Sequence, residues 1–115
     1  MKGIMDADTN ICAVILNYND AQTTKKLAES WKDSRAIHNI IIVDNCSTDD
    51  SWEQLQVLKD EKVDLIRTEK NGGYGYGNNT GIRYAIEHNG ATHVLVANPA
   101  EGYGIFLENM LTTAG

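Results

Sequence analysis

Short apolar runs alternate with helical patterns along this chain, and no other feature constrains its fold as strongly. The runs at 11–16 (ICAVIL) and 40–43 (IIIV) contain no polar residue. Unbroken runs of this length are typical of strands that are covered on both faces. Residues 63–66 and 93–97 predict a third and a fourth strand, and residues 105–111 are expected to begin a last helix.

Helix signals fill the segments between the strands. Asp20 fits the N-cap of a first helix, and Ser47 with Asp50 matches a Ser-x-x-Asp capping pattern for a second. A third helix is expected to follow a glycine-rich stretch. Strands that alternate with helices indicate βαβ units in a parallel sheet. We therefore predict an α/β fold, a three-layer α/β/α sandwich with a mainly parallel sheet of about four strands. Residues 1–10 are interpreted as a loose leader and residues 11–115 as one domain.

Composition excludes several classes of protein. Ten basic and sixteen acidic residues give a net charge of −6, which argues against a nucleic-acid-binding face. The longest apolar run has six residues, whereas a membrane helix needs about 20, and no signal-peptide pattern is present. We therefore expect a cytoplasmic protein without membrane insertion. Cys12 and Cys46 are too few for a disulfide framework and are interpreted as buried or half-buried thiols.

Polar segments follow each predicted strand. They span 17–20 (NYND), 44–50 (DNCSTDD), 69–79 (EKNGGYGYGNN) and 98–102 (NPAEG), and all are rich in Asn, Asp or Gly. In a parallel sheet, the loops after the carboxyl ends of the strands gather along one edge, where ligands bind. The sequence therefore predicts a ligand site at this edge.

Asp44 stands directly after the second strand run, where two interpretations remain open. Its carboxylate can accept hydrogen bonds from a ribose hydroxyl or from a base N–H. Alternatively, it caps the turn that follows, a role for which Asp is favoured.

The glycine-rich stretch also leaves two interpretations open. Its glycines let the backbone come close to a ligand, and if Asn78 opens the next helix, the free N–H groups there can meet a diphosphate. The alternative is a flexible loop without a ligand. Tyr74 and Tyr76 either stack on a base or sugar or close the loop. The dinucleotide pattern G-x-G-x-x-G is absent, which argues against a Rossmann-type oxidoreductase.

Four segments together resemble the amino-terminal, nucleotide-binding half of family 2 glycosyltransferases, and the rhamnosyltransferase-like branch in particular. They are VILNYND (14–20), IIIVDNCSTDD (40–50), EKNGGYGYGNNTGIRYA (69–85) and HVLVANP (93–99), and the resemblance covers about residues 11–101. It implies a GT-A fold, which is Rossmann-like, and a UDP-, GDP- or dTDP-linked sugar as donor. It also implies inverting transfer to an acceptor hydroxyl, aided by Mg²⁺ or Mn²⁺, in cell-surface polysaccharide biosynthesis.

The resemblance also assigns nucleotide-binding positions. Tyr18 corresponds to an aromatic residue beside the base, and Asp44 to an acidic residue that contacts base or ribose. The segment 71–79 corresponds to the part of the family that flanks the donor. The expected nucleotide-binding residues are therefore Tyr18, Asn19, Asp44, Asn45, Asn71, Gly73, Gly75, Gly77, Asn78 and Asn79.

Two departures from the family pattern shape the functional prediction. The metal-binding carboxylate should follow the fourth strand, but the sequence reads Asn98-Pro99-Ala100, so that Asn98 and Glu101 are the only candidate metal ligands there. The chain also ends before the half that would supply the acceptor site and the general base, so we assign no catalytic residue. We expect a truncated, inactive, glycosyltransferase-like domain that forms homo-oligomers through its uncovered surface. The alternative is a noncatalytic binding or interaction module that keeps the fold.

Overall fold

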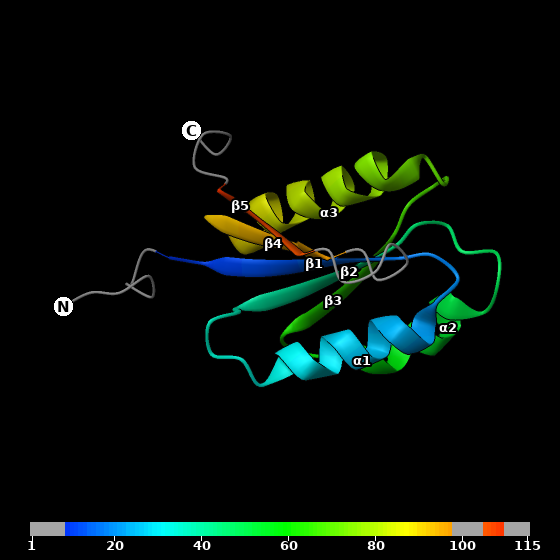
Figure 1. The fold of residues 1–115 in the computed structure, drawn as a ribbon, viewed down its shortest axis with the longest axis horizontal. Helices are drawn as coiled ribbons and strands as arrows, with labels where there is room; N and C mark the ends of the chain where they lie inside the picture. The colour runs from blue at the N-terminus through cyan, green and yellow to red at the C-terminus, as the bar shows by residue number, and fades with distance from the viewer. Residues whose placement is uncertain (1–8, 98–104, 110–115) are drawn as a thin grey trace.

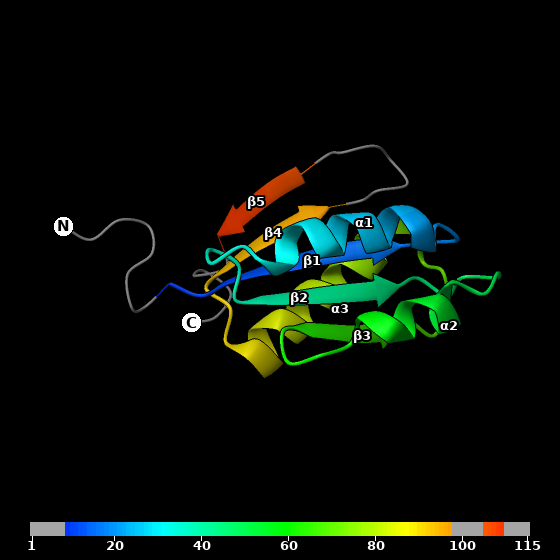
Figure 2. The ribbon, with the colours of Figure 1, turned by 90° about the horizontal axis from the view of Figure 1, so that it is seen from below.

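The computed structural model describes residues 9–97 and 105–109 and contains a central five-stranded sheet. The strand order is β3-β2-β1-β4-β5 (Figure 2). The first four strands pair in parallel, and β5 pairs antiparallel with β4. The strands are β1 (Ile11–Asn17), β2 (Asn39–Asp44), β3 (Val63–Arg67), β4 (His93–Ala97) and β5 (Ile105–Asn109).

Helices cover both faces of the sheet. The helices α1 (Ala21–Lys32) and α2 (Ser51–Leu55) lie on one face, and α3 (Gly73–Asn89) lies on the other (Figure 1). A short 3₁₀ helix, η1 (Gln56–Leu58), continues α2. The prediction of a three-layer α/β sandwich with a mainly parallel sheet is therefore confirmed.

The two apolar runs form the centre of the sheet because each sends side chains into both layers. Val14 and Val43 are buried in the cluster under α3, whereas Ile15 and Ile42 are buried in the cluster under α1 and α2. All four side chains are inaccessible to solvent. Burial on both faces explains why the sequences of these strands are unbroken apolar runs rather than alternating patterns.

Cys12 lies in the cluster under α3, and burial raises the pKa of its thiol to about 11.

The end of the described chain differs from the prediction. Residues 105–109 form strand β5 instead of beginning a helix, and Ala97 pairs with Ile105 at one end of the ladder. The outer edge of β4 offers unpaired N–H and C=O groups, so pairing with this edge decides the conformation of a short segment that sequence periodicity leaves ambiguous.

Of the predicted loose leader at 1–10, residues 1–8 lie outside the described part of the chain. Its last residue, Asn10, is hydrogen-bonded to Thr92 and Asn89. Its backbone N–H donates to Thr92 Oγ1 at 2.8 Å, and its side-chain amide donates to the carbonyl of Asn89 at 2.7 Å. Asn10 therefore anchors the entry to β1 against the turn that precedes β4.

The predicted helix starts are correct for α1 and wrong for α2. Asp20 caps α1, since its side chain accepts from the N–H of Thr23 at 3.3 Å. The predicted Ser47–Asp50 capping pair does not form, because Asp44 takes the Ser47 hydroxyl. Asp49 instead accepts from the N–H of Ser51 at 2.8 Å, and hydrogen bonding from Ser51 lowers the pKa of the Asp49 carboxyl.

Helix α3 packs unusually close to β1 and β2 because it presents glycines to them. A Cβ atom added at Gly81 would lie 2.5 Å from Cγ1 of Val14 and 2.7 Å from Cγ2 of Val43. Gly77 likewise faces the side chains of Leu16 and Asn45. The glycines lower the intrinsic helix propensity of this segment, but they allow the helix backbone to pack directly against the side chains of the sheet. Within the described residues, no helix is both long and apolar enough to span a membrane.

We expect Gly81→Ala to destabilise the fold, since the two valines it would meet are buried and conformationally stiff. Overpacking of this kind costs about 1–3 kcal/mol, against a gain of about 1 kcal/mol in helix propensity. Gly75→Ala is the matched control, because a Cβ there meets nothing within 4 Å. Urea unfolding should give a lower midpoint for G81A and an equal or higher one for G75A; equal stability of the two variants would contradict the close-packing argument.

Candidate functional site

Polar residues end three neighbouring strands in register, at the carboxyl edge of the sheet. Asn17 pairs with Asp44, and Asp44 pairs with Arg67. Asn17 and Asp44 are buried, with 1% and 0% of their surface exposed. Polar groups buried to this degree need hydrogen-bond partners, and the partners connect the loops that follow the strands.

Asp44 is the centre of this network. Its Oδ1 accepts from Asn17 Nδ2 at 3.0 Å and from Ser47 Oγ at 2.5 Å, and its Oδ2 accepts from the N–H of Ser47 at 3.3 Å. The Arg67 guanidinium lies 3.4 Å from Oδ2. The Thr24 hydroxyl in turn donates to Asn17 Oδ1 at 2.6 Å. Both carboxylate oxygens are therefore engaged within the protein, as the turn-capping interpretation of Asp44 expects.

Asn19 joins the loop after β1 to the loop after β2. Its backbone has a φ of 53°, in the left-handed region that Asn tolerates. Its Oδ1 accepts from the N–H groups of Thr48 and Asp49, and its own N–H donates to Ser47 Oγ. The hydrogen bonds of Asn19 thus hold the two loops together. Tyr18 is positioned between two fixed residues, Asn17 and Asn19.

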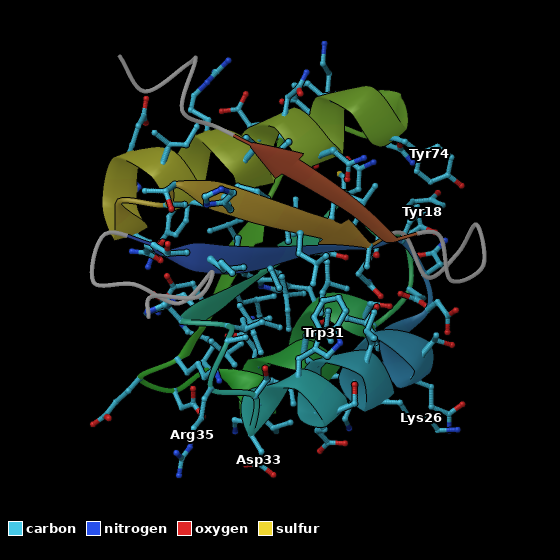
Figure 3. All side chains as sticks on the ribbon, turned by 60° about the vertical axis from the view of Figure 1, so that its left-hand side comes forward. Tyr18, Lys26, Trp31, Asp33, Arg35 and Tyr74 are labelled. Carbon is cyan, nitrogen blue, oxygen red and sulfur yellow. The ribbon has the colours of Figure 1, made fainter. Side chains whose placement is uncertain are left out.

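A cavity of about 240 Å³ lies beside this network, at the carboxyl edge. Four of the sequence-predicted residues line it, together with one further tyrosine; they are Tyr18, Asn45, Asn71, Gly73 and Tyr74. Figure 3 shows Tyr18 and Tyr74 at the same end of the molecule, one from the loop after β1 and one from the start of α3. Tyr74 is not among the predicted nucleotide-binding residues, although the sequence left open whether it stacks on a base or sugar or closes the loop. In the structure its side chain is 43% exposed.

Asn45 and Asn71 form the polar wall of the cavity with the backbone of Gly73. Asn45 Nδ2 donates to Asn71 Oδ1 and to the carbonyl of Gly73, both at 3.2 Å. The N–H of Gly73 donates back to Asn71 Oδ1 at 3.0 Å. Loops from two different strands are therefore locked together where they meet the cavity.

The remaining predicted positions lie on α3 rather than in a loop. Asn78 does not open the helix, which begins at Gly73, and both Asn78 and Asn79 stand in its second turn. Gly75 faces open space and Gly77 faces the sheet. The helix extends further back than predicted because packing on β1 and β2 outweighs the low helix propensity of glycine. The first turn of α3 consequently begins at Gly73 and Tyr74, which line the cavity.

The predicted metal ligands cannot be compared with the structure. Asn98 and Glu101, with Ala100 between them, lie outside the described residues. Across residues 9–97, no three or more His, Cys, Asp or Glu side chains are grouped in a way that could hold a metal ion. The described part of the chain therefore supplies no ligand set for Mg²⁺ or Mn²⁺, which stays a prediction.

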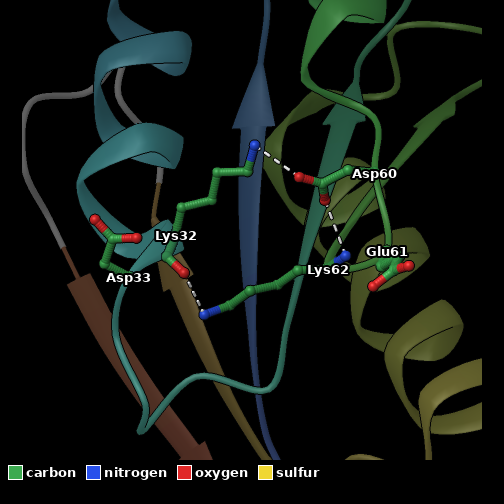
Figure 4. A pocket seen from close by; sticks show the side chains of 5 residues that line it. All are labelled: Lys32, Asp33, Asp60, Glu61 and Lys62. Carbon is green, nitrogen blue, oxygen red and sulfur yellow. Dashed lines mark hydrogen bonds and ion pairs between the residues drawn. The ribbon is translucent and has the colours of Figure 1, made fainter.

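A larger cavity of about 590 Å³ lies at the opposite edge of the sheet (Figure 4). Lys32 and Lys62 line this cavity together with three acidic residues, and both ammonium groups have partners. Lys32 Nζ lies 2.6 Å from Asp60, and Lys62 Nζ donates to the carbonyls of Lys32 and Ser34. Hydrogen bonds from Lys32 and from the backbone of Lys62 and Val63 lower the pKa of Asp60. These contacts connect the C-terminal end of α1 to the residues before β3 and engage both ammonium groups within the protein.

Comparison with known proteins identifies the family to which this chain belongs. Residues 12–88 match the sequence profile of the family described as glycosyl transferase family 2. This match spans more than half of the chain and includes the loops after β1 and β2 and most of α3. The chain belongs to glycosyl transferase family 2. The predicted resemblance to family 2 is thereby confirmed, and three of the four segments that carry it, 14–20, 40–50 and 69–85, lie within the matched residues.

Individual relatives of this family 2 chain agree. The low-salt glycan biosynthesis hexosyltransferase Agl10 of Haloferax volcanii is 31% identical over 90 residues, which cover 78% of this chain and 27% of Agl10. The structures of TarS from S. aureus (19% identity) and of the mannosyltransferase PcManGT from Pyrobaculum calidifontis (16% identity) superpose with TM-scores of 0.62 and 0.63. These cover 78% and 77% of this chain and 27% of each structure. The GT-A fold is therefore confirmed, and the chain spans about a quarter of the length of these relatives.

We expect Asp44→Asn to destabilise the family 2 chain by about 2 kcal/mol or more. Each carboxylate oxygen faces two donors, Asn17 and the Ser47 hydroxyl at Oδ1 and the Ser47 N–H and Arg67 at Oδ2, so the amide NH₂ of asparagine would meet donors at either position. Asp33→Asn, at the exposed end of α1, removes the same charge without a buried partner and should leave stability unchanged. Thermal unfolding by circular dichroism measures both. An unaltered melting temperature for D44N would show that the network at the strand ends contributes little.

Proposed function

We propose that this chain binds the nucleotide of a nucleotide-diphosphate sugar and forms the donor-binding part of a hexosyltransferase. The observation that carries the proposal is the convergence of two tyrosines and two asparagine amides on one cavity at the carboxyl edge of the sheet. Aromatic side chains supply stacking surfaces for a base, and amides supply hydrogen-bonding groups for its edge. Ligands of open α/β sheets bind at this edge.

The start of α3 supports the diphosphate part of the proposal. Gly73 and Tyr74 line the cavity and belong to the first turn of a 17-residue helix. The dipole of the helix favours negative charge at this end. A diphosphate attached to a base in the cavity would therefore lie in a favourable field.

The relatives support the reaction class. Agl10 is a hexosyltransferase of glycan biosynthesis by name, and PcManGT was solved in complex with GDP-Man and Mn²⁺. By analogy, the donor would lose its nucleoside diphosphate as an acceptor hydroxyl attacks the anomeric carbon with inversion. In this reaction the described residues would hold the base and orient the diphosphate. We assign no general base to this chain. The residues predicted to hold a metal ion, Asn98 and Glu101, lie outside the described part of the chain.

We expect the chain to bind at least one of UDP, GDP and dTDP in isothermal titration calorimetry. Tyr18→Ala should weaken this binding by about tenfold, since the loss of one base–aromatic stack costs about 1–3 kcal/mol. Tyr76→Ala is the matched control, because Tyr76 is an exposed tyrosine near the start of α3 that does not line the cavity. Each titration is repeated with Mn²⁺, and binding should persist without the metal because position 100 is alanine.

The outcome that would overturn the proposal is equally clear. If none of the three nucleotides binds, with or without Mn²⁺, the chain keeps the fold without the ligand and is a noncatalytic binding or interaction module. If Y18A and Y76A weaken binding equally, the nucleotide occupies a different place on the molecule.

We also expect no transferase turnover from the 115-residue chain alone, because it spans 27% of the length of its relatives and we assign it no general base. Release of nucleoside diphosphate from panels of donors and acceptors measures this. Sustained turnover would contradict the prediction. Homo-oligomerisation, expected from the uncovered surface, is measured on the same sample by light scattering.

A further inference from the structure

The backbone of Gly73 determines which way two side-chain amides of the cavity face. Its carbonyl can only accept a hydrogen bond, so the Asn45 atom 3.2 Å away must be the amide nitrogen. Its N–H can only donate, so the Asn71 atom 3.0 Å away must be the amide oxygen. The hydrogen bond from Asn45 Nδ2 to Asn71 Oδ1, at 3.2 Å, agrees with both assignments.

These bonds use all of the acceptor capacity of the Asn71 side chain. An amide oxygen has two lone pairs, and the two donors on Asn71 Oδ1 are Asn45 Nδ2 and the N–H of Gly73. Asn45, which donates to Asn71, is only 2% exposed, and its own Oδ1 accepts from the Thr68 hydroxyl at 3.0 Å. Asn71 therefore cannot flip without breaking contacts with both neighbours.

The unused part of Asn71 is its NH₂ group. Asn71 is exposed and lines the cavity, and its Nδ2 has no hydrogen-bond partner among the described residues. An asparagine side chain that is free to flip can present either a donor or an acceptor to a ligand. This one presents a donor alone.

We propose that Asn71 is a specificity-determining residue that selects a keto base: its fixed NH₂ group donates to O4 of uracil or thymine, or to O6 of guanine or hypoxanthine. The inference rests on the proposed function, since it assumes that the base of the donor occupies this cavity. Adenine and cytosine carry an amino group at the corresponding position of the ring. Two N–H donors would then face each other, and neither would be satisfied.

Two pairs of nucleotides test this directly by calorimetry on the 115-residue chain. UDP and CDP differ in the keto or amino group of a pyrimidine, and IDP and ADP differ in the same way for a purine. Leaving a donor unsatisfied costs about 1–3 kcal/mol, so the keto member of whichever pair binds should bind about tenfold more tightly or better.

The substitution Asn71→Asp should reverse this preference. One carboxylate oxygen keeps the bonds from Asn45 and Gly73, and the other replaces the NH₂ group with an acceptor that suits an amino base. The ratio of the keto to the amino dissociation constant should therefore shift by about tenfold or more toward the amino base. Asn39→Asp, the same change at the opposite edge of the sheet, should leave the ratio as it is. Asn71→Ala should bring the ratio close to one.

The outcomes separate this inference from the proposed function. Keto preference in the wild type that shifts in N71D but not in N39D supports both. Nucleotide binding without keto preference, or with a preference that N71D and N71A leave unchanged, overturns the role of Asn71 and leaves the proposed function standing. No binding of any nucleotide overturns both. Circular dichroism of each variant establishes that it is folded.

Discussion

The buried carboxylate of Asp44 is the constraint on which the functional edge of this protein depends. A charged group with no exposed surface is tolerated only where donors surround it. Here the donors come from three strands and their loops, through Asn17, Ser47 and Arg67. The same contacts that satisfy the carboxylate draw the loops after β1 and β2 together. Tyr18 and Asn45 consequently reach the same cavity although they lie 27 positions apart in the chain.

Close packing of α3 against the sheet brings Gly73 and Tyr74 to that cavity. Gly77 and Gly81 place the helix against the side chains of Leu16, Val14 and Val43, so its first turn extends to the ends of the strands. Larger residues at these positions would push the helix outward and separate Gly73 from Asn45. The glycines of this stretch therefore serve two needs, close contact with the sheet and backbone access to the polar wall, which helix propensity alone would not reveal.

The sequence predicts those features of the fold that depend on residues close together in the chain, and it fails where a distant residue decides the conformation. The two-sided burial of 11–16 and 40–43 is visible in an unbroken apolar run, and Asp20 caps α1 through a contact three residues away. Both were predicted. The conformation of 105–109 depends on pairing with β4, and the diversion of Ser47 from α2 depends on Asp44, so both predictions failed. In these cases a tertiary partner competes successfully with the local signal.

The same division holds for the site. By itself, the sequence determined that polar residues follow each strand, that Tyr18, Asn45 and Asn71 belong to such segments, and that the chain resembles glycosyl transferase family 2. It did so because the end of a strand and the polar residues of the loop that follows are consecutive in the chain and are therefore visible as a local pattern. Only the tertiary structure decided that Asp44 and Asn19 hold the loops while Asn45 and Asn71 line the cavity. An amide or carboxylate can serve either purpose, and the choice is made by which donors and acceptors folding brings within about 3 Å of it.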